Sequence, residues 1–97
     1  MKFTNENQTL TLFLEGELNS YNSEEVEKEI ESIMNKNSFK KVVIDMGDLT
    51  YISSAGLRIL VRIKQQYNDT SIIKVSSDVY DVLEMVGFDN LFKIQQL

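Results

Sequence analysis

Leucine occupies every second position of residues 9–15, and polar or aromatic residues lie between the leucines. Such a period of two is typical of a half-buried strand. Residues 2–5 predict a shorter edge strand, and the polar turn at residues 6–8 joins the two into an expected hairpin. Gly16 interrupts the alternation, so we expect residues 17–21 to connect this hairpin to a helix.

The apolar spacing then lengthens to three and four residues, which is the period of a helix with one buried face. It predicts a first helix over residues 23–35, a second over residues 57–67 and a third that Gly87 ends. Asn22 or Ser23 is the expected N-cap of the first helix, and Asn22 has Glu25 in the capping-box position. Ser76 or Ser77 caps the third.

Short apolar runs rich in β-branched residues separate these helices and predict buried strands. One covers residues 41–46, and we expect a turn at residues 47–48 with a polar loop after it. Another covers residues 71–75. A last turn and strand follow Gly87 and carry four apolar side chains: Phe88, Leu91, Phe92 and Ile94.

The resulting order of elements, ββαβαβαβ, predicts an α/β fold in which three α-helices pack on a mixed four- to five-stranded β-sheet. Residues 1–97 are long enough for a single domain with one core. The sequence has no internal repeat and no low-complexity segment that would indicate a linker.

The composition excludes several kinds of site. The chain has neither Cys nor His, so it lacks the usual ligands of a structural zinc site and the commonest general base. No apolar run approaches the length of a membrane span, and we expect a cytoplasmic protein without membrane insertion. No metal, cofactor or tight ATP binding is expected, because no phosphate-cradling glycine loop is present.

The net charge of −5 arises entirely in the first half of the chain, where residues 1–50 contain 5 Lys and Arg against 10 Asp and Glu. Residues 51–97 contain 5 of each class. No basic stripe is visible, and nucleic acid is therefore not an expected partner. The acidic run is explained most simply as a solvated helix face, and attraction or repulsion of a partner is the alternative.

Small residues at positions 53–56, Ser-Ser-Ala-Gly, join the expected loop to the second helix. Ser53 or Ser54 suits the N-cap, where a hydroxyl accepts a hydrogen bond from the first helical turn. A phosphate on either hydroxyl would meet free backbone N–H groups and the positive end of the helix dipole. Asp45 and Asp48 are a weaker candidate for acid–base or metal chemistry, since no further positioned group accompanies them.

Three stretches resemble the STAS domain of bacterial anti-sigma-factor antagonists: VVIDMGDLTYISSAGLRIL, EGELNSYNSEEVEKEI and VLEMVGFDNLFKI. The resemblance covers about residues 9–94 and implies a STAS-like fold. In that family a partner kinase, which is also the anti-sigma factor, phosphorylates a serine at the start of the central helix. Alignment of the motif identifies that serine as Ser54, with Ser53 as the alternative acceptor.

The resemblance implies a non-enzymatic protein-interaction switch. Unmodified, the chain would bind an anti-sigma factor/serine kinase and free a sigma factor; phosphorylated, it would release its partner, and a serine phosphatase is a further expected partner. The alternative is a non-phosphorylated STAS scaffold or subunit of a transporter or larger signalling assembly. The expected partner-binding residues come from two segments: Ser20, Tyr21, Asn22, Ser53, Ser54, Ala55, Gly56, Leu57 and Arg58.

This chain departs from the family pattern at three places. Ser53 replaces an aspartate that often precedes the acceptor, and Asn19 replaces an aspartate that frequently follows the GEL-like triplet. Many relatives have a further helix after the last strand, so we expect an apolar face to be open here and a homodimer to be one use of it. We also expect a side chain introduced at Gly56 to crowd the surface that a kinase approaches, and to weaken binding more than folding; the alternative is that Gly56 allows close helix packing.

Overall fold

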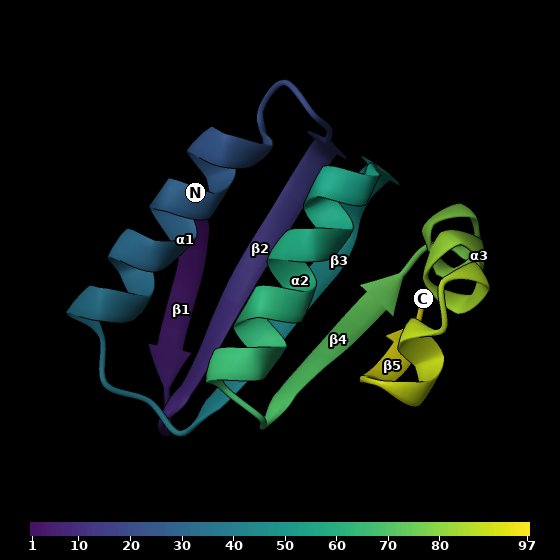
Figure 1. The fold of residues 1–97 in the computed structure, drawn as a ribbon. Helices are drawn as coiled ribbons and strands as arrows, with labels where there is room; N and C mark the ends of the chain where they lie inside the picture. Colours follow the sequence, from purple (N-terminus) through teal and green to yellow (C-terminus); the bar gives the residue numbers. More distant parts are fainter.

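The computed structural model describes all 97 residues, and Figure 1 shows how its helices and strands are arranged. The elements follow one another along the chain as β1 (Lys2–Glu6), β2 (Thr9–Leu18), α1 (Ser23–Lys36), β3 (Lys41–Ile52), α2 (Ser54–Gln66), β4 (Thr70–Val75), α3 (Ser77–Met85), a short 3-10 helix η1 (Phe88–Asn90) and β5 (Lys93–Gln96).

The five strands form one sheet in the order β1-β2-β3-β4-β5. β1 is antiparallel to β2, and every other neighbouring pair is parallel. The mixed sheet with three α-helices confirms the predicted fold class. Asn7 and Gln8 form the turn of the hairpin, and both have positive φ angles, 53° and 64°. Such angles suit a two-residue turn between antiparallel strands.

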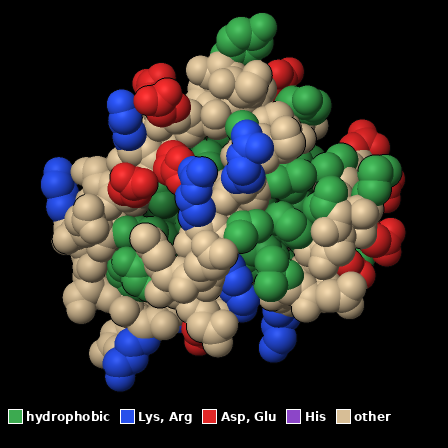
Figure 2. Space-filling model, viewed as in Figure 1, with side chains coloured by type: hydrophobic (Ala, Val, Ile, Leu, Met, Phe, Trp, Pro, Cys, Tyr) green, Lys and Arg blue, Asp and Glu red, His purple; other side chains and the backbone are tan.

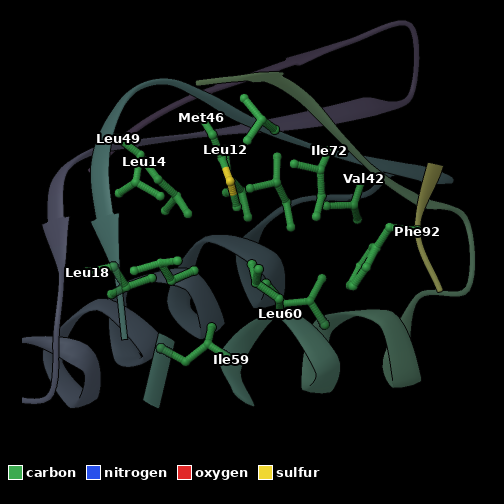
Figure 3. Packing of buried hydrophobic residues seen from close by; sticks show 14 of the residues in the cluster. Leu12, Leu14, Leu18, Val42, Met46, Leu49, Ile59, Leu60, Ile72 and Phe92 are labelled. Carbon is green, nitrogen blue, oxygen red and sulfur yellow. The ribbon is translucent and has the colours of Figure 1, made fainter. Parts of the chain in front are cut away.

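α1 and α2 pack against one face of the sheet, in front of β1, β2 and β3, and α3 lies at the end of β4 next to β5 (Figure 1). Between the two layers lies a core of 20 buried apolar residues, part of which Figure 3 shows. The alternating leucines of β2 all point into this core and are at most 5% exposed. The core holds the ends of β2 and β3 in fixed positions against the first turn of α2.

Two strands are longer than the sequence pattern predicts. β2 continues past Gly16 to Leu18, because Gly16 adopts a φ of 69° inside the strand. β3 continues past residues 47–48, so the predicted turn and the following loop are wrong. The pairing of β2 with β3 shifts register twice, which lets the longer strand stay hydrogen-bonded. Asp48 consequently pairs with Glu15 in the sheet and is not a turn residue.

The C-terminal segment largely covers its own apolar side chains. Gly87, with a φ of 82°, follows the end of α3 as predicted. Phe88 and Phe92 are buried, Ile94 is half-buried, and Leu91 is 44% exposed. Of the four apolar residues of this segment, Leu91 alone is largely exposed. None of the helices is long and apolar enough to cross a membrane.

Candidate functional site

The candidate site lies where β2 and β3 end and the helices that follow them begin. Leu18 and Ile52, the last residues of these strands, pair with each other in the sheet. The backbone N–H of Ser53 donates to the carbonyl oxygen of Leu18 at 2.8 Å. Residues 19–22 and residues 53–58 therefore lie next to each other, although more than thirty positions separate them in the sequence.

Two asparagine side chains fix the loop that precedes α1. The Asn19 side-chain oxygen accepts hydrogen bonds from the backbone N–H groups of Tyr21 and Asn22, at 2.9 and 3.1 Å. The Asn22 side-chain oxygen accepts from the backbone N–H of Asn19 at 2.9 Å, and its amide nitrogen donates to the carbonyl of Glu17 at 2.7 Å. Asn22 is the N-cap residue but makes no capping hydrogen bond, so the predicted capping box with Glu25 is wrong.

The two serines at the start of α2 have different environments. Ser53 is half-buried at the N-cap, and its Oγ accepts a hydrogen bond from the backbone N–H of Gly56 at 3.3 Å. Ser54 is the first residue of the helix and is exposed, and its hydroxyl makes no hydrogen bond within the chain. Ser53 thus has a structural role as the cap, while the Ser54 hydroxyl is open to an approaching group.

Gly56 is buried and faces the interior rather than the surface. A Cβ atom built on it would lie 2.8 Å from the Ile52 Cγ1 atom and 2.8 Å from the Leu18 Cγ atom. Distances this short are essentially never seen for real Cβ atoms. The expectation that a side chain at Gly56 would crowd the outer surface is therefore wrong, because it would collide with the ends of β2 and β3 first.

The remaining predicted partner-binding residues lie at or near the surface on this end of the molecule. Ser20, Ser54 and Arg58 are exposed, and Tyr21 is 96% exposed. Four others are half-buried: Asn22, Ser53, Ala55 and Leu57.

Sequence reasoning did not include Tyr51, which is 51% exposed and pairs with Glu17 beside the site. Its exposure results from the second register shift in β3, between the pairs Gly16–Leu49 and Glu17–Tyr51. The polar Thr50–Tyr51 pair between the buried Leu49 and Ile52 is the signal in the sequence, although it does not by itself show a strand.

Charge is distributed unevenly among the three helices. α2 contains three basic residues and no acidic residue, whereas α3 contains three acidic residues and no basic one. α1 contains five glutamates and two lysines. Figure 2 shows Lys and Arg side chains near the middle of the face that α2 occupies. α2 is therefore a positively charged helix within a chain of net charge −5, and Arg58 is its basic residue nearest the site.

The buried carboxylate of Asp45 already has a hydrogen-bond donor and a cation as partners within the sheet. It accepts a hydrogen bond from the backbone N–H of Gly47 at 2.9 Å, and the Lys74 ammonium lies 3.6 Å away. No group of three or more acidic side chains is placed to hold a metal ion. The Asp45 carboxylate thus has a role in fixing the register shift of β3.

Comparison with known proteins shows which family the sequence matches. The model of the family described as the STAS domain matches residues 1–96. A protein of Bordetella bronchiseptica, provisionally named anti-sigma factor antagonist BtrV, is 34% identical over 85 residues, which are 84% of this chain and 72% of that protein.

Solved structures share the fold at lower sequence identity. A Thermotoga maritima protein, also provisionally described as an anti-sigma factor antagonist, superposes with a TM-score of 0.88 at 21% identity over 99% of this chain and 86% of that one. The anti-sigma factor antagonist SpoIIAA in its unphosphorylated form gives a TM-score of 0.75 at 17% identity, over 96% of this chain and 87% of that one. The phosphorylated form of SpoIIAA, from Bacillus, gives a TM-score of 0.66 at 16% identity, over 96% of this chain and 90% of that one.

Proposed function

This chain belongs to the STAS domain family, and from that premise we propose that it is an anti-sigma factor antagonist whose binding is controlled by phosphorylation of Ser54. The observation that carries the proposal is the exposed, unbonded hydroxyl of Ser54 at the start of α2. A relative with the same fold, SpoIIAA, has both an unphosphorylated and a phosphorylated form, which supports a switch of this kind.

In the unmodified state the surface formed by residues 19–22 and the first turns of α2 binds an anti-sigma factor that is also a serine kinase. The sigma factor is thereby freed. Transfer of a phosphoryl group to Ser54 adds a charge of about −1.5 to −2 at neutral pH. The partner then dissociates, and a serine phosphatase restores the binding form.

The fold of this chain is suited to carry the phosphate. The first turn of α2 contains no acidic residue, so nothing in that turn repels an added anion. The backbone N–H groups and the dipole at the helix N-terminus favour negative charge there. We therefore expect phosphorylation to change binding and to leave folding largely unaffected.

Ser53 is the weaker candidate for the acceptor because its Oγ is already engaged as the N-cap and its side chain is half-buried. A kinase acting on Ser53 would first have to break that cap. A scaffold is equally compatible with an exposed serine at this position, so phosphorylation itself distinguishes the switch from a non-phosphorylated scaffold.

The test is incubation of the purified chain with ATP and the serine kinases of the anti-sigma-factor type encoded in the same genome, followed by mass spectrometry of the peptides. We expect one phosphate, on Ser54, and none on the Ser54→Ala variant. Phosphate on Ser53 alone would contradict the assignment of the acceptor. A chain that binds such a partner and is never phosphorylated would instead support the scaffold function.

A further inference from the structure

Arg58 differs from the other two basic residues of α2 in having no partner within the chain. Arg62 is paired with Glu27 of α1, with its Nη1 atom 2.6 Å from one carboxylate oxygen and 2.8 Å from the other. Lys64 donates to the carbonyl of Asn68, and its ammonium lies 5.8 Å from the centre of the Phe92 ring. Arg58 is exposed, and no carboxylate of the chain lies within 4.0 Å of it. Its charge is therefore available to a group outside the chain.

The position of Arg58 places that charge beside the candidate acceptor. Residues four apart on a helix lie on the same side, about 5 to 6 Å apart at Cβ, so Arg58 follows Ser54 by one turn on the outer side of α2. Leu57 is half-buried beside it, and Tyr21 is almost fully exposed on the adjacent loop. A cation next to accessible apolar and aromatic side chains is the composition of a protein-binding surface.

We propose that Arg58 binds a carboxylate on an acidic surface of the anti-sigma factor, and that the phosphate on Ser54 takes Arg58 away from that carboxylate. The proposal rests on the proposed function and names the chemistry of its partner. The argument is charge complementarity, because Arg58 is an exposed cation without a carboxylate neighbour and the first turn of α2 before it contains no acidic residue. A planar guanidinium pairs with a carboxylate through two parallel hydrogen bonds, which makes the contact specific in direction.

Phosphorylation of Ser54 breaks the contact between Arg58 and the partner's carboxylate without a change in fold. A phosphate on Ser54 offers three strong acceptor oxygens one turn from the guanidinium, and Arg–phosphate pairs are among the strongest charge-assisted hydrogen bonds. The surface that presented one positive charge then presents a net negative charge. The partner's carboxylate loses its cation and meets a like charge, which favours dissociation.

The first test measures affinity for the anti-sigma factor/serine kinase by calorimetry, for the parent chain and for Arg58→Gln, with Lys28→Gln as the matched control. Lys28 is an exposed lysine of α1 whose only ion pair, to Glu24, has an N–O distance of 3.6 Å. We expect Arg58→Gln to weaken binding by about ten- to a hundredfold, since truncating one partner of an interfacial charge pair commonly costs this much. Lys28→Gln should bind as the parent does, and all three proteins should melt at the same temperature.

A folded Arg58→Gln variant that binds as tightly as the parent would overturn the proposal while leaving the proposed function intact. A parent chain that binds no such partner would instead refute the proposed function. The two failures are thus distinguishable within one experiment.

The second test needs no partner and asks whether Arg58 binds the phosphate on Ser54. Phosphoserine is installed at position 54 during translation, and the second pKa of its phosphate is measured by phosphorus NMR in the parent and in Arg58→Gln. A neighbouring guanidinium favours the dianion, so we expect the phosphate pKa to be lower in the parent than in the variant. Arg58→Lys should restore part of the difference. Identical phosphate pKa values in the parent and Arg58→Gln would overturn the proposal that Arg58 is captured.

Discussion

Gly56 is the residue at which function and packing are most easily confused. It lies in the first turn of α2 beside the candidate acceptor, yet a Cβ atom there would overlap the side chains of Leu18 and Ile52. We expect Gly56→Val to lower the free energy of unfolding by about 2 kcal/mol or more, because overpacking of this kind forces neighbouring side chains and backbone to move. Urea denaturation measures the change.

The control is Ala55→Val, one position earlier, where the side chain is half-buried. It introduces the same branched side chain into the same helical turn and should lower the free energy of unfolding by less than about 1 kcal/mol. If Gly56→Val unfolds at the same urea concentration as the parent, the close approach of α2 to the strand ends is wrong.

Ser53 and Ser54 form a second matched pair at this scale. Ser53→Ala removes the oxygen that accepts from the Gly56 N–H and should lower the free energy of unfolding by about 1 kcal/mol. Ser54→Ala removes an exposed hydroxyl with no partner and should change it by less than about 0.5 kcal/mol. Thermal melts of both variants measure this, and a larger loss for Ser54→Ala would contradict the assignment of Ser53 as the cap.

At the scale of elements, the loop before α1 depends on the Asn19 side chain. Its oxygen accepts from two backbone N–H groups, so Asn19→Ala leaves both without that partner and should lower the free energy of unfolding by about 1 to 2 kcal/mol. Asn19→Asp keeps an oxygen in the same place but replaces the amide nitrogen, which lies 3.4 Å from a Glu17 carboxylate oxygen, with a second carboxylate oxygen, so it should avoid only part of this loss. Equal losses for the two variants in urea denaturation would show that these hydrogen bonds do not determine the loop.

The Arg62–Glu27 pair is a contact between α1 and α2 that lies beyond the two segments of the site. Both side chains retain access to water, with the Arg62 side chain 57% and the Glu27 side chain 22% exposed. We expect a double-mutant cycle with Arg62→Gln and Glu27→Gln to give a coupling energy of about 0.5 to 1 kcal/mol, which should fall as salt is added. A coupling of zero at low salt would mean that the two helices are held by apolar packing alone.

The order and type of the elements follow from local patterns, and their ends do not. Leucine alternation predicts β2, and apolar spacing predicts the three helices, because each pattern reflects a single buried face. The extension of β3 through Gly47 to Ile52 depends instead on pairing with β2 and on two register shifts. Gly and Asp favour turns, so the local sequence predicts a turn at residues 47–48. Pairing with β2 keeps these residues in the strand, and the local sequence contains no information about that pairing.

At the scale of the whole molecule, the site exists because a parallel sheet brings the ends of β2 and β3 together. Residues 19–22 and 53–58 could be predicted as a shared surface only through family resemblance, since periodicity gives no information on which strands are neighbours. The sequence also leaves open which serine is accessible. That distinction depends on the residue at which α2 begins, and the structure separates Ser53, which caps the helix, from the exposed Ser54, which is its first residue.

The central claim is that a phosphate on Ser54 controls binding of the anti-sigma factor. The most direct measurement is the dissociation constant of the chain carrying phosphoserine at position 54, compared with that of the unmodified chain, against the same anti-sigma factor/serine kinase. A penalty of several kcal/mol for unpaired like charge corresponds to a loss of about a hundredfold or more, and we predict a loss of that size together with melting close to the parent. Equal dissociation constants for the two forms would contradict the account.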